Sequence, residues 1–74
     1  MKTLGVVQDI TRTGEILVKA DRLTARRGTV FDGRKRRIGR IKRVFGPVDS
    51  PYVLVIPESG LNLNSVLNQK VFVG

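Results

Sequence analysis

The fold class follows from residues 4–20, LGVVQDITRTGEILVKA, in which two apolar runs flank a turn-forming Thr-Arg-Thr-Gly tetrapeptide. Apolar side chains recur at alternate positions in each run, and charged side chains such as Glu15 and Lys19 lie between them. Because this alternation is typical of a strand with one buried face, the segment predicts two paired strands. The side chains expected to point into the core are Leu4, Val6, Ile10, Ile16, Val18 and Ala20.

The rest of the chain repeats this pattern of short apolar runs separated by Gly, Pro, Asn or Asp. The chain is rich in β-branched residues, with eleven valines, five isoleucines and five threonines but only two alanines. Such side chains favour strands over helices. The remaining expected elements are strands at 29–31, around Ile38, at 52–56 and at 70–73, a loop at 21–28, and a turn or single helical turn at 61–67. Six short strands predict an all-β fold, a small closed six-stranded β-barrel in one domain of residues 1–74, because closure removes exposed edge strands.

The fourth expected strand is irregular, because Ile38, Ile41 and Val44 are spaced by three rather than two. That spacing alone suggests a helix, but Gly39 interrupts the segment and a Phe-Gly-Pro sequence ends it. Since a glycine within a strand commonly marks a β-bulge, we expect a bulge near Gly39 that reconciles the spacing with a strand. Just before this strand, the Asp-Gly dipeptide at 32–33 predicts a two-residue type I′ hairpin turn.

The composition argues against an enzyme. The chain has 74 residues, 14 of them basic and six acidic, with a net charge of +8 and neither cysteine nor histidine. A disulfide framework, a thiolate metal site, and the commonest general base and metal ligand are therefore missing. The carboxylates are scattered singly, and no glycine-rich phosphate loop occurs. We expect no catalysis, metal, cofactor or small-molecule substrate. Without a signal peptide or a membrane-spanning apolar stretch, we expect a cytoplasmic protein.

The densest charge lies in residues 34–43, which hold seven of the 14 basic side chains. These are Arg34, Lys35, Arg36, Arg37, Arg40, Lys42 and Arg43. One interpretation is a surface that faces RNA, because cations that neutralise phosphates release counterions. The other is a solvated face that keeps the barrel soluble and protects its edges. No aromatic side chain in the run offers a stacking platform, so base-specific recognition is not expected, while contact with a phosphate backbone or an acidic protein surface stays open.

A proline-containing loop follows the basic run, within the sequence VFGPVDSPYV of residues 44–53. Its two prolines fix φ and make their neighbours extended, which gives a stiff loop that presents Phe45, Val48 and Tyr52. Such a loop suits an anchor for a partner, and it equally suits a barrel corner whose aromatic side chains close the core. The run 52–56 is apolar on both faces, so it is either a central strand or a strand with one face against another protein.

The segment from Ile38 to Val48, IGRIKRVFGPV, followed by Pro-Tyr-Val at 51–53, resembles the signature of the Gar-type core protein of H/ACA ribonucleoproteins. That signature reads aliphatic-Gly-x-aliphatic-x-x-aliphatic-Phe-Gly-Pro-Val followed by Pro-Tyr. The similarity extends to both ends of the chain through Leu4-Gly5-x-Val7, Gly14, Asp32 and Val71-Phe72-Val73. Asn68 stands where many members carry glycine. Because asparagine tolerates positive φ, the turn there is expected to survive.

The resemblance implies a six-stranded barrel, similar to those of elongation factors and reductases, without an active site of its own. Members bind the pseudouridine synthase subunit and support RNA-guided pseudouridylation of rRNA in ribosome biogenesis, by helping to load and turn over the substrate RNA. The chain lacks a Gly-Arg-rich tail and so resembles the archaeal form, which touches the guide RNA little and reaches guide and substrate rRNA through the particle. The implied contact residues are Ile41, Val44, Phe45, Gly46, Pro47, Val48, Pro51, Tyr52 and Val53.

A function of a different class also fits the composition. The basic run at 34–43 is consistent with an autonomous small RNA-binding barrel of the ribosomal or single-strand type. That alternative predicts salt-dependent binding of the isolated chain to RNA, whereas the resemblance predicts a protein partner.

Overall fold

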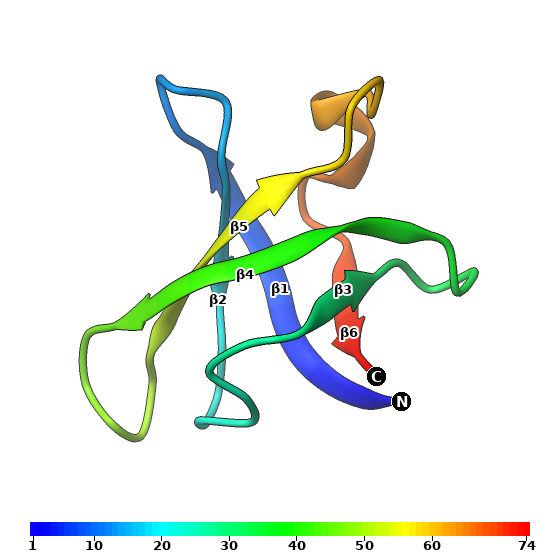
Figure 1. The fold of residues 1–74 in the computed structure, drawn as a ribbon. Coiled ribbons are helices and arrows are strands. Elements are labelled where there is room, and N and C mark those ends of the chain that lie inside the picture. The colour runs from blue at the N-terminus through cyan, green and yellow to red at the C-terminus, as the bar shows by residue number, and fades with distance from the viewer.

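The computed structural model describes residues 1–74 as a closed barrel of antiparallel strands (Figure 1). The elements are β1 (Lys2–Ile10), β2 (Ile16–Lys19), β3 (Thr29–Phe31), β4 (Arg37–Phe45), β5 (Tyr52–Pro57), the 3-10 helix η1 (Leu63–Val66) and β6 (Lys70–Val73). Around the barrel the strands follow the order β1-β2-β5-β4-β3-β6. The predicted all-β fold and closed six-stranded barrel are confirmed. The four-residue η1 is the only helix, and no helix of the chain is long and apolar enough to cross a membrane.

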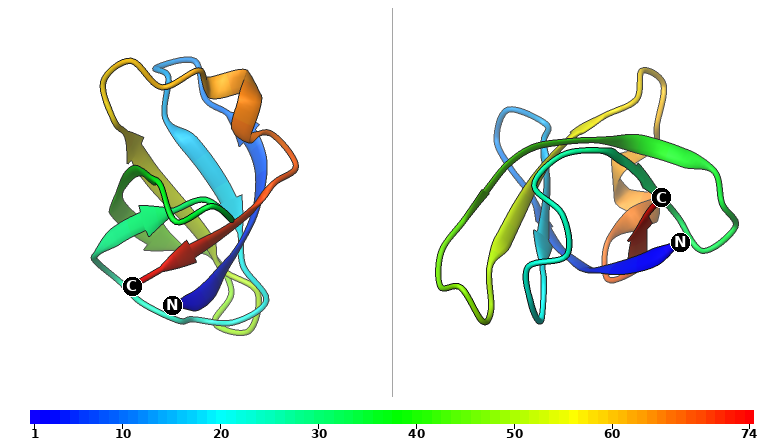
Figure 2. Two further views of the ribbon diagram at one scale, coloured as in Figure 1. Left: turned by 90° about the vertical axis from the view of Figure 1, so that its right-hand side faces the viewer. Right: turned by 60° about the horizontal axis from the view of Figure 1, so that its bottom comes forward.

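The two longest strands are β1 and β4. Each has nine residues and pairs with two neighbours, β1 with β2 and β6, and β4 with β5 and β3. Both strands contain register shifts on each side, and bulges of this kind bend a strand and increase its twist. The two views in Figure 2 show these strands curving around the interior, with η1 at one end of the barrel.

The bulges in β1 correct one core prediction. Val6 is 42% exposed, whereas Val7 is fully buried. The register shifts between Thr3 and Gly5 against β6, and between Val7 and Asp9 against β2. Because each bulge inserts one extra residue, it resets the alternation of inward and outward side chains. The expectation that Val6 lies in the core is therefore wrong, and Val7 takes that place.

The expected bulge near Gly39 is confirmed, and a second one follows it in β4. Ile38 is the extra residue against β3, and Lys42 is the extra residue against β5. Two bulges within nine residues convert a period of two into the spacing of three between Ile38, Ile41 and Val44, whose side chains are buried or half-buried. The strand interpretation therefore holds in spite of the helix-like spacing.

The β3–β4 turn differs from the predicted type I′ turn. The Asp32 carbonyl accepts a hydrogen bond from the Lys35 N–H, and the Asp32 N–H donates to the Arg36 carbonyl, which leaves three residues in the loop. The positive φ of 65° belongs to Lys35 and not to Gly33. The Asp32 carboxylate accepts hydrogen bonds from the N–H groups of Arg34 and Arg36. Because an aspartate can hold a turn through such bonds, the Asp32 side chain determines the shape of this loop. The turn does not need the conformational freedom of Gly33.

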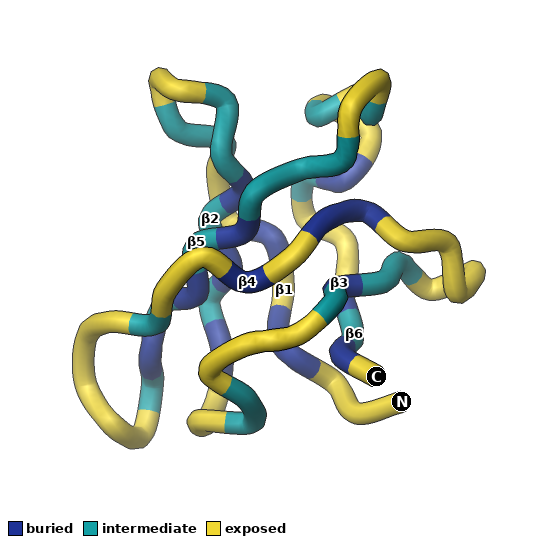
Figure 3. The backbone as a smooth tube through the Cα atoms, in the orientation of Figure 1, coloured by how far each residue is buried: buried dark blue, intermediate teal, exposed yellow.

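Thirteen apolar side chains fill the barrel, and no polar side chain is buried among them. They are Leu4, Val7, Ile16, Val18, Ala20, Val30, Ile38, Ile41, Val53, Val55, Val66, Val71 and Val73. Ile10, also predicted inward, is half-buried and packs against this core. The loop at 21–28 and the single helical turn are as expected, and Asn68 has the positive φ of 65° that was predicted for it. Figure 3 shows the buried positions along the strands and the exposed ones mainly in loops and turns.

Candidate functional site

The β4–β5 loop, residues 46–51, lies at one end of the barrel and is held from both sides (Figure 1). β4 ends at Phe45, which pairs directly with Tyr52 at the start of β5. The Pro51 side chain is buried, and its carbonyl accepts a 2.9 Å hydrogen bond from the N–H of Ala20 after β2. These contacts and the two proline rings restrict the loop, so it presents its side chains with little conformational entropy to lose.

Two aromatic rings stack across the base of this loop. The centroids of Phe45 and Tyr52 are 5.6 Å apart and the ring planes differ by 22°. Lys19 places its Nζ 4.2 Å from the Tyr52 centroid, and Arg43 places its Cζ 5.1 Å from the Phe45 centroid. The stacked pair contributes about 0.5–1.5 kcal/mol, and each cation over a ring about 0.5–1 kcal/mol at an exposed site. The rings therefore hold each other and two cations in place.

The tip of the loop exposes an apolar patch made of Phe45, Pro47 and Val48, called the loop patch below. Val48 is 83% exposed, more than any other large apolar side chain, and Phe45 is 38% exposed. Pro47 is also exposed. A single exposed apolar side chain is ordinary, but three of them grouped on a stiff loop form a surface suited to a partner.

The structure separates the nine contact residues implied by the resemblance into a surface set and a core set. Ile41 and Val53 are 8% and 1% exposed and belong to the barrel core, and Pro51 is buried as well. Strand alternation turns Ile41 inward two residues after the buried Gly39, and it does the same for Val53. These three residues are therefore corrected from contact residues to supports of the loop. The residues left at the surface are Val44, Phe45, Gly46, Pro47, Val48 and Tyr52, of which Val44 and Tyr52 are half-buried.

The basic run does not form one uniform positive surface. Its ion pairs are Arg36 with Asp32 at 3.0 Å, Arg37 with Glu58 at 2.5 Å, and Lys42 with Glu15 at 2.6 Å. Arg43 lies over the Phe45 ring, so the side chains with neither an ion pair nor a ring partner are Arg34, Lys35 and Arg40. The turn that holds the first two is separated from the loop patch by the length of β4, about 26 Å at about 3.3 Å per residue.

Two carboxylates that engage the basic run have lowered pKa values. The hydrogen bond from Lys42 holds the pKa of Glu15 below its ordinary value. Desolvation raises the pKa of Asp32, but the hydrogen bonds from the N–H groups of Arg36 and Arg34 and from the Arg36 guanidinium outweigh it, so the pKa is lowered. Both side chains therefore stay ionised at neutral pH and offset part of the local positive charge.

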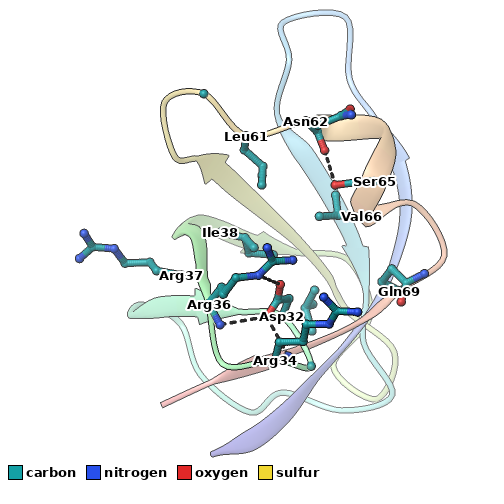
Figure 4. A pocket seen from close by; sticks show the side chains of 13 residues that line it. Asp32, Arg34, Arg36, Arg37, Ile38, Leu61, Asn62, Ser65, Val66 and Gln69 are labelled. Carbon is teal, nitrogen blue, oxygen red and sulfur yellow. Dashed lines mark hydrogen bonds and ion pairs between the residues drawn. The ribbon is translucent and has the colours of Figure 1, made fainter.

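A hollow of about 740 Å³ lies between the β3–β4 turn and the segment around η1 (Figure 4). Ile38, Leu61 and Val66 contribute apolar lining, and Arg34 and Arg36 contribute charge. Figure 4 shows the ion pair of Arg36 with Asp32, while the side chain of Arg37 extends away from the hollow. One of the two guanidinium groups is therefore already paired. No group of three or more acidic side chains gathers to hold a metal ion.

The sequence did not predict that Lys19 contacts the aromatic rings at the base of the β4–β5 loop. Lys19 lies in β2 directly opposite Tyr52, and that register places its ammonium group over the ring. The pairing of strands that are far apart in the sequence leaves no local signal, so only a correct alignment of β2 with β5 reveals this contact.

Comparison with known proteins places the chain beside an uncharacterized relative. No protein-family model matches the chain. An uncharacterized protein of Methanothermobacter thermautotrophicus is 32% identical over 62 residues, which make up 84% of this chain and 67% of that protein. The aligned part thus includes most of the barrel. The chain belongs to the family of this Methanothermobacter protein.

Proposed function

We propose that this chain is a non-catalytic accessory subunit of an H/ACA-type ribonucleoprotein. In this role it binds the pseudouridine synthase subunit and supports loading and turnover of substrate rRNA during RNA-guided pseudouridylation in ribosome biogenesis. It acts in the cytoplasm without a cofactor, and it meets the guide RNA and the substrate rRNA through the particle.

The loop patch is the observation that carries this proposal. The segment that resembles the Gar-type signature contains the one stiff loop of the barrel whose apolar tip lies in water. Exposing Val48 to 83% and Phe45 to 38% costs free energy unless another surface covers them. The stacking of Phe45 on Tyr52 holds the loop base, so the patch is organised before a partner arrives. These features are those of a binding anchor and fit a protein partner.

Substitution in the loop patch tests the proposal directly. Val48→Asp is expected to weaken binding to the synthase subunit by about 2 kcal/mol or more, which is about 30-fold, because it places a charge at the centre of the patch. Isothermal titration calorimetry of the two purified proteins without RNA measures this loss.

Ser59→Asp is the matched control. It adds the same charge at an exposed position beyond the other end of β5 and should leave the affinity unchanged. Failure of the wild-type chain to bind the synthase subunit without RNA would disprove the proposed function. Equal effects of both variants would show that the loop patch is not the anchor.

An autonomous RNA-binding barrel is the second candidate, favoured by one observation. Arg34, Lys35 and Arg40 have neither an ion pair nor a ring partner and are exposed, so they are free to meet phosphates. This function requires micromolar or tighter binding of the isolated chain to RNA that weakens steeply as salt is raised. Fluorescence anisotropy with labelled RNA over a salt series distinguishes the two candidates, because the accessory subunit needs no such affinity.

A further inference from the structure

A row of outward side chains crosses five strands of the barrel and ends at the loop patch. Val6 in β1 pairs with Lys70 in β6 on one side and with Lys19 in β2 on the other. Lys19 then pairs with Tyr52 in β5, and Tyr52 pairs with Phe45 in β4. Directly opposite residues share the outer face of the barrel, so these five side chains follow one another around it. Because the barrel is closed, the row curves, and the members next to the loop patch are Lys19, Tyr52 and Phe45 on the adjacent strands β2, β5 and β4.

Cationic and apolar side chains are interleaved in this row. Lys70, Lys19 and, beside Phe45, Arg43 supply positive charge, and Val6 and the two aromatic rings supply apolar surface. None of the three ion pairs in the structure involves one of these cations. Their charges are therefore available to an external partner.

Two of the cations are held in position before any partner binds. Lys19 and Arg43 each lie over a ring of the stacked pair, at 4.2 and 5.1 Å from the centroids. A cation restrained in this way loses less side-chain entropy when it forms an ion pair. The two charges flank the aromatic pair, and so they define where opposite charges must lie on a complementary surface.

The geometry fits a protein better than it fits a single-stranded nucleic acid. Each ring packs against the other and already has a cation near its centroid, so a nucleobase that stacks here competes with these contacts. The other apolar groups, Val6 and Val48, are aliphatic and exposed, as in a protein interface. Charge complementarity at such a surface requires carboxylates.

We propose that the row binds a protein surface on which carboxylates surround an apolar centre, with the carboxylates pairing to Lys19 and Arg43 and the apolar centre covering the loop patch. This proposal rests on the proposed function, in which that surface belongs to the synthase subunit. It extends the contact from the loop across β5 to Lys19 in β2, a residue outside the segment that resembles the signature.

Charge reversal tests the inference in the intact chain. The double variant Lys19→Glu, Arg43→Glu should bind the synthase subunit at least about tenfold more weakly than the wild type, and its affinity should depend less on salt between about 50 and about 300 mM. The matched double variant Arg34→Glu, Lys35→Glu makes the same change in net charge at the opposite end of β4 and should stay within about twofold. Lys19→Met keeps an apolar contact with the Tyr52 ring but removes the charge, and it should reproduce part of the loss.

The outcomes separate this inference from the proposed function. If Val48→Asp abolishes binding while both charge-reversed variants bind like the wild type, the loop contact stands and the row is not part of the interface. Equal losses in the two double variants would also overturn the inference, since only net charge would matter. If the Lys19, Arg43 variant loses affinity for an RNA oligonucleotide and retains the synthase subunit, the row contacts RNA instead. If the wild-type chain does not bind the synthase subunit, the function and the inference both fail.

Discussion

Single residues that lack a side chain show how tightly this small barrel is built. A Cβ at Gly39 would collide with the carbonyl oxygen of Ile56 and would meet the side chain of Val55 at 2.9 Å. Gly39 pairs with both neighbouring strands at the bulged part of β4, where the backbones come close together. Because backbone atoms cannot yield as a flexible side chain can, the position requires glycine for space.

Gly39→Ala should therefore lower the free energy of unfolding by about 2 kcal/mol or more, through a steric clash in the core wall. Gly33→Ala is the control, since nothing lies within 4 Å of its added Cβ and its φ is not positive. It should change stability by no more than about 0.5–1 kcal/mol. Urea unfolding followed by circular dichroism measures both, and a similar small effect for the two variants would refute the steric argument.

At the scale of elements, the turns of this chain are shaped by hydrogen bonding as much as by glycine. In the β3–β4 turn, the carboxylate of Asp32 holds two N–H groups, and Lys35 adopts the positive φ that a glycine would adopt more easily. In the turn before β6, Asn68 has the same φ of 65°. A left-handed conformation costs an ordinary residue about 1–2 kcal/mol, whereas asparagine tolerates it better.

Lys35→Gly should accordingly stabilise the barrel by about 0.5–1 kcal/mol, because the relief of backbone strain exceeds the entropy that glycine adds to the unfolded chain. Asn68→Gly should give a smaller gain or none. Thermal unfolding of the two variants under the same conditions compares them. A larger gain at Asn68 would contradict the assignment of strain to Lys35.

At the scale of the whole molecule, stability rests on thirteen apolar side chains and a few surface ion pairs. A domain of this size buries only about 60% of the surface that its unfolded chain exposes, so its stability is marginal. Binding a partner through the folded form stabilises such a domain by mass action. The proposed role as a subunit fits this small core.

Acid should destabilise the barrel through Asp32 and Glu15. Their pKa values lie below the ordinary 3.8 and 4.5 in the folded chain, so the folded state favours the ionised forms. This contribution is fully present above the ordinary values and is lost as the pH falls through the folded-state pKa values. The melting temperature should fall as the pH is lowered below about 4.5.

The double variant Asp32→Asn, Glu15→Gln checks the assignment. Its melting temperature should be lower than that of the wild type at pH 7, and it should fall less steeply on acidification. Asp49→Asn, which removes a carboxylate that makes no ion pair, should leave the acid dependence unchanged. If the melting temperature of the double variant falls on acidification as steeply as that of the wild type, these two carboxylates do not cause the loss of stability in acid.

Local sequence was sufficient to predict the six strands, the loop at 21–28, the helical turn and the bulge near Gly39. Alternation, β-branched side chains and glycine act within a few residues, so their consequences can be read along the chain. The two prolines also predicted a stiff loop, but the sequence left open whether Phe45 and Tyr52 face a partner or close the core.

The tertiary structure was needed wherever a residue's place depends on its neighbour in another strand. The bulges in β1 place Val7 in the core and Val6 at the surface, and the bulge at Lys42 brings Val44 to the same face as Ile41. The position of Lys19 over Tyr52 follows from the register of two strands joined by a long stretch of chain. The register of two paired strands is set by the packing of the whole barrel. A shift of one residue would move every side chain of a strand to the opposite face of the sheet, so no local sequence pattern determines the register.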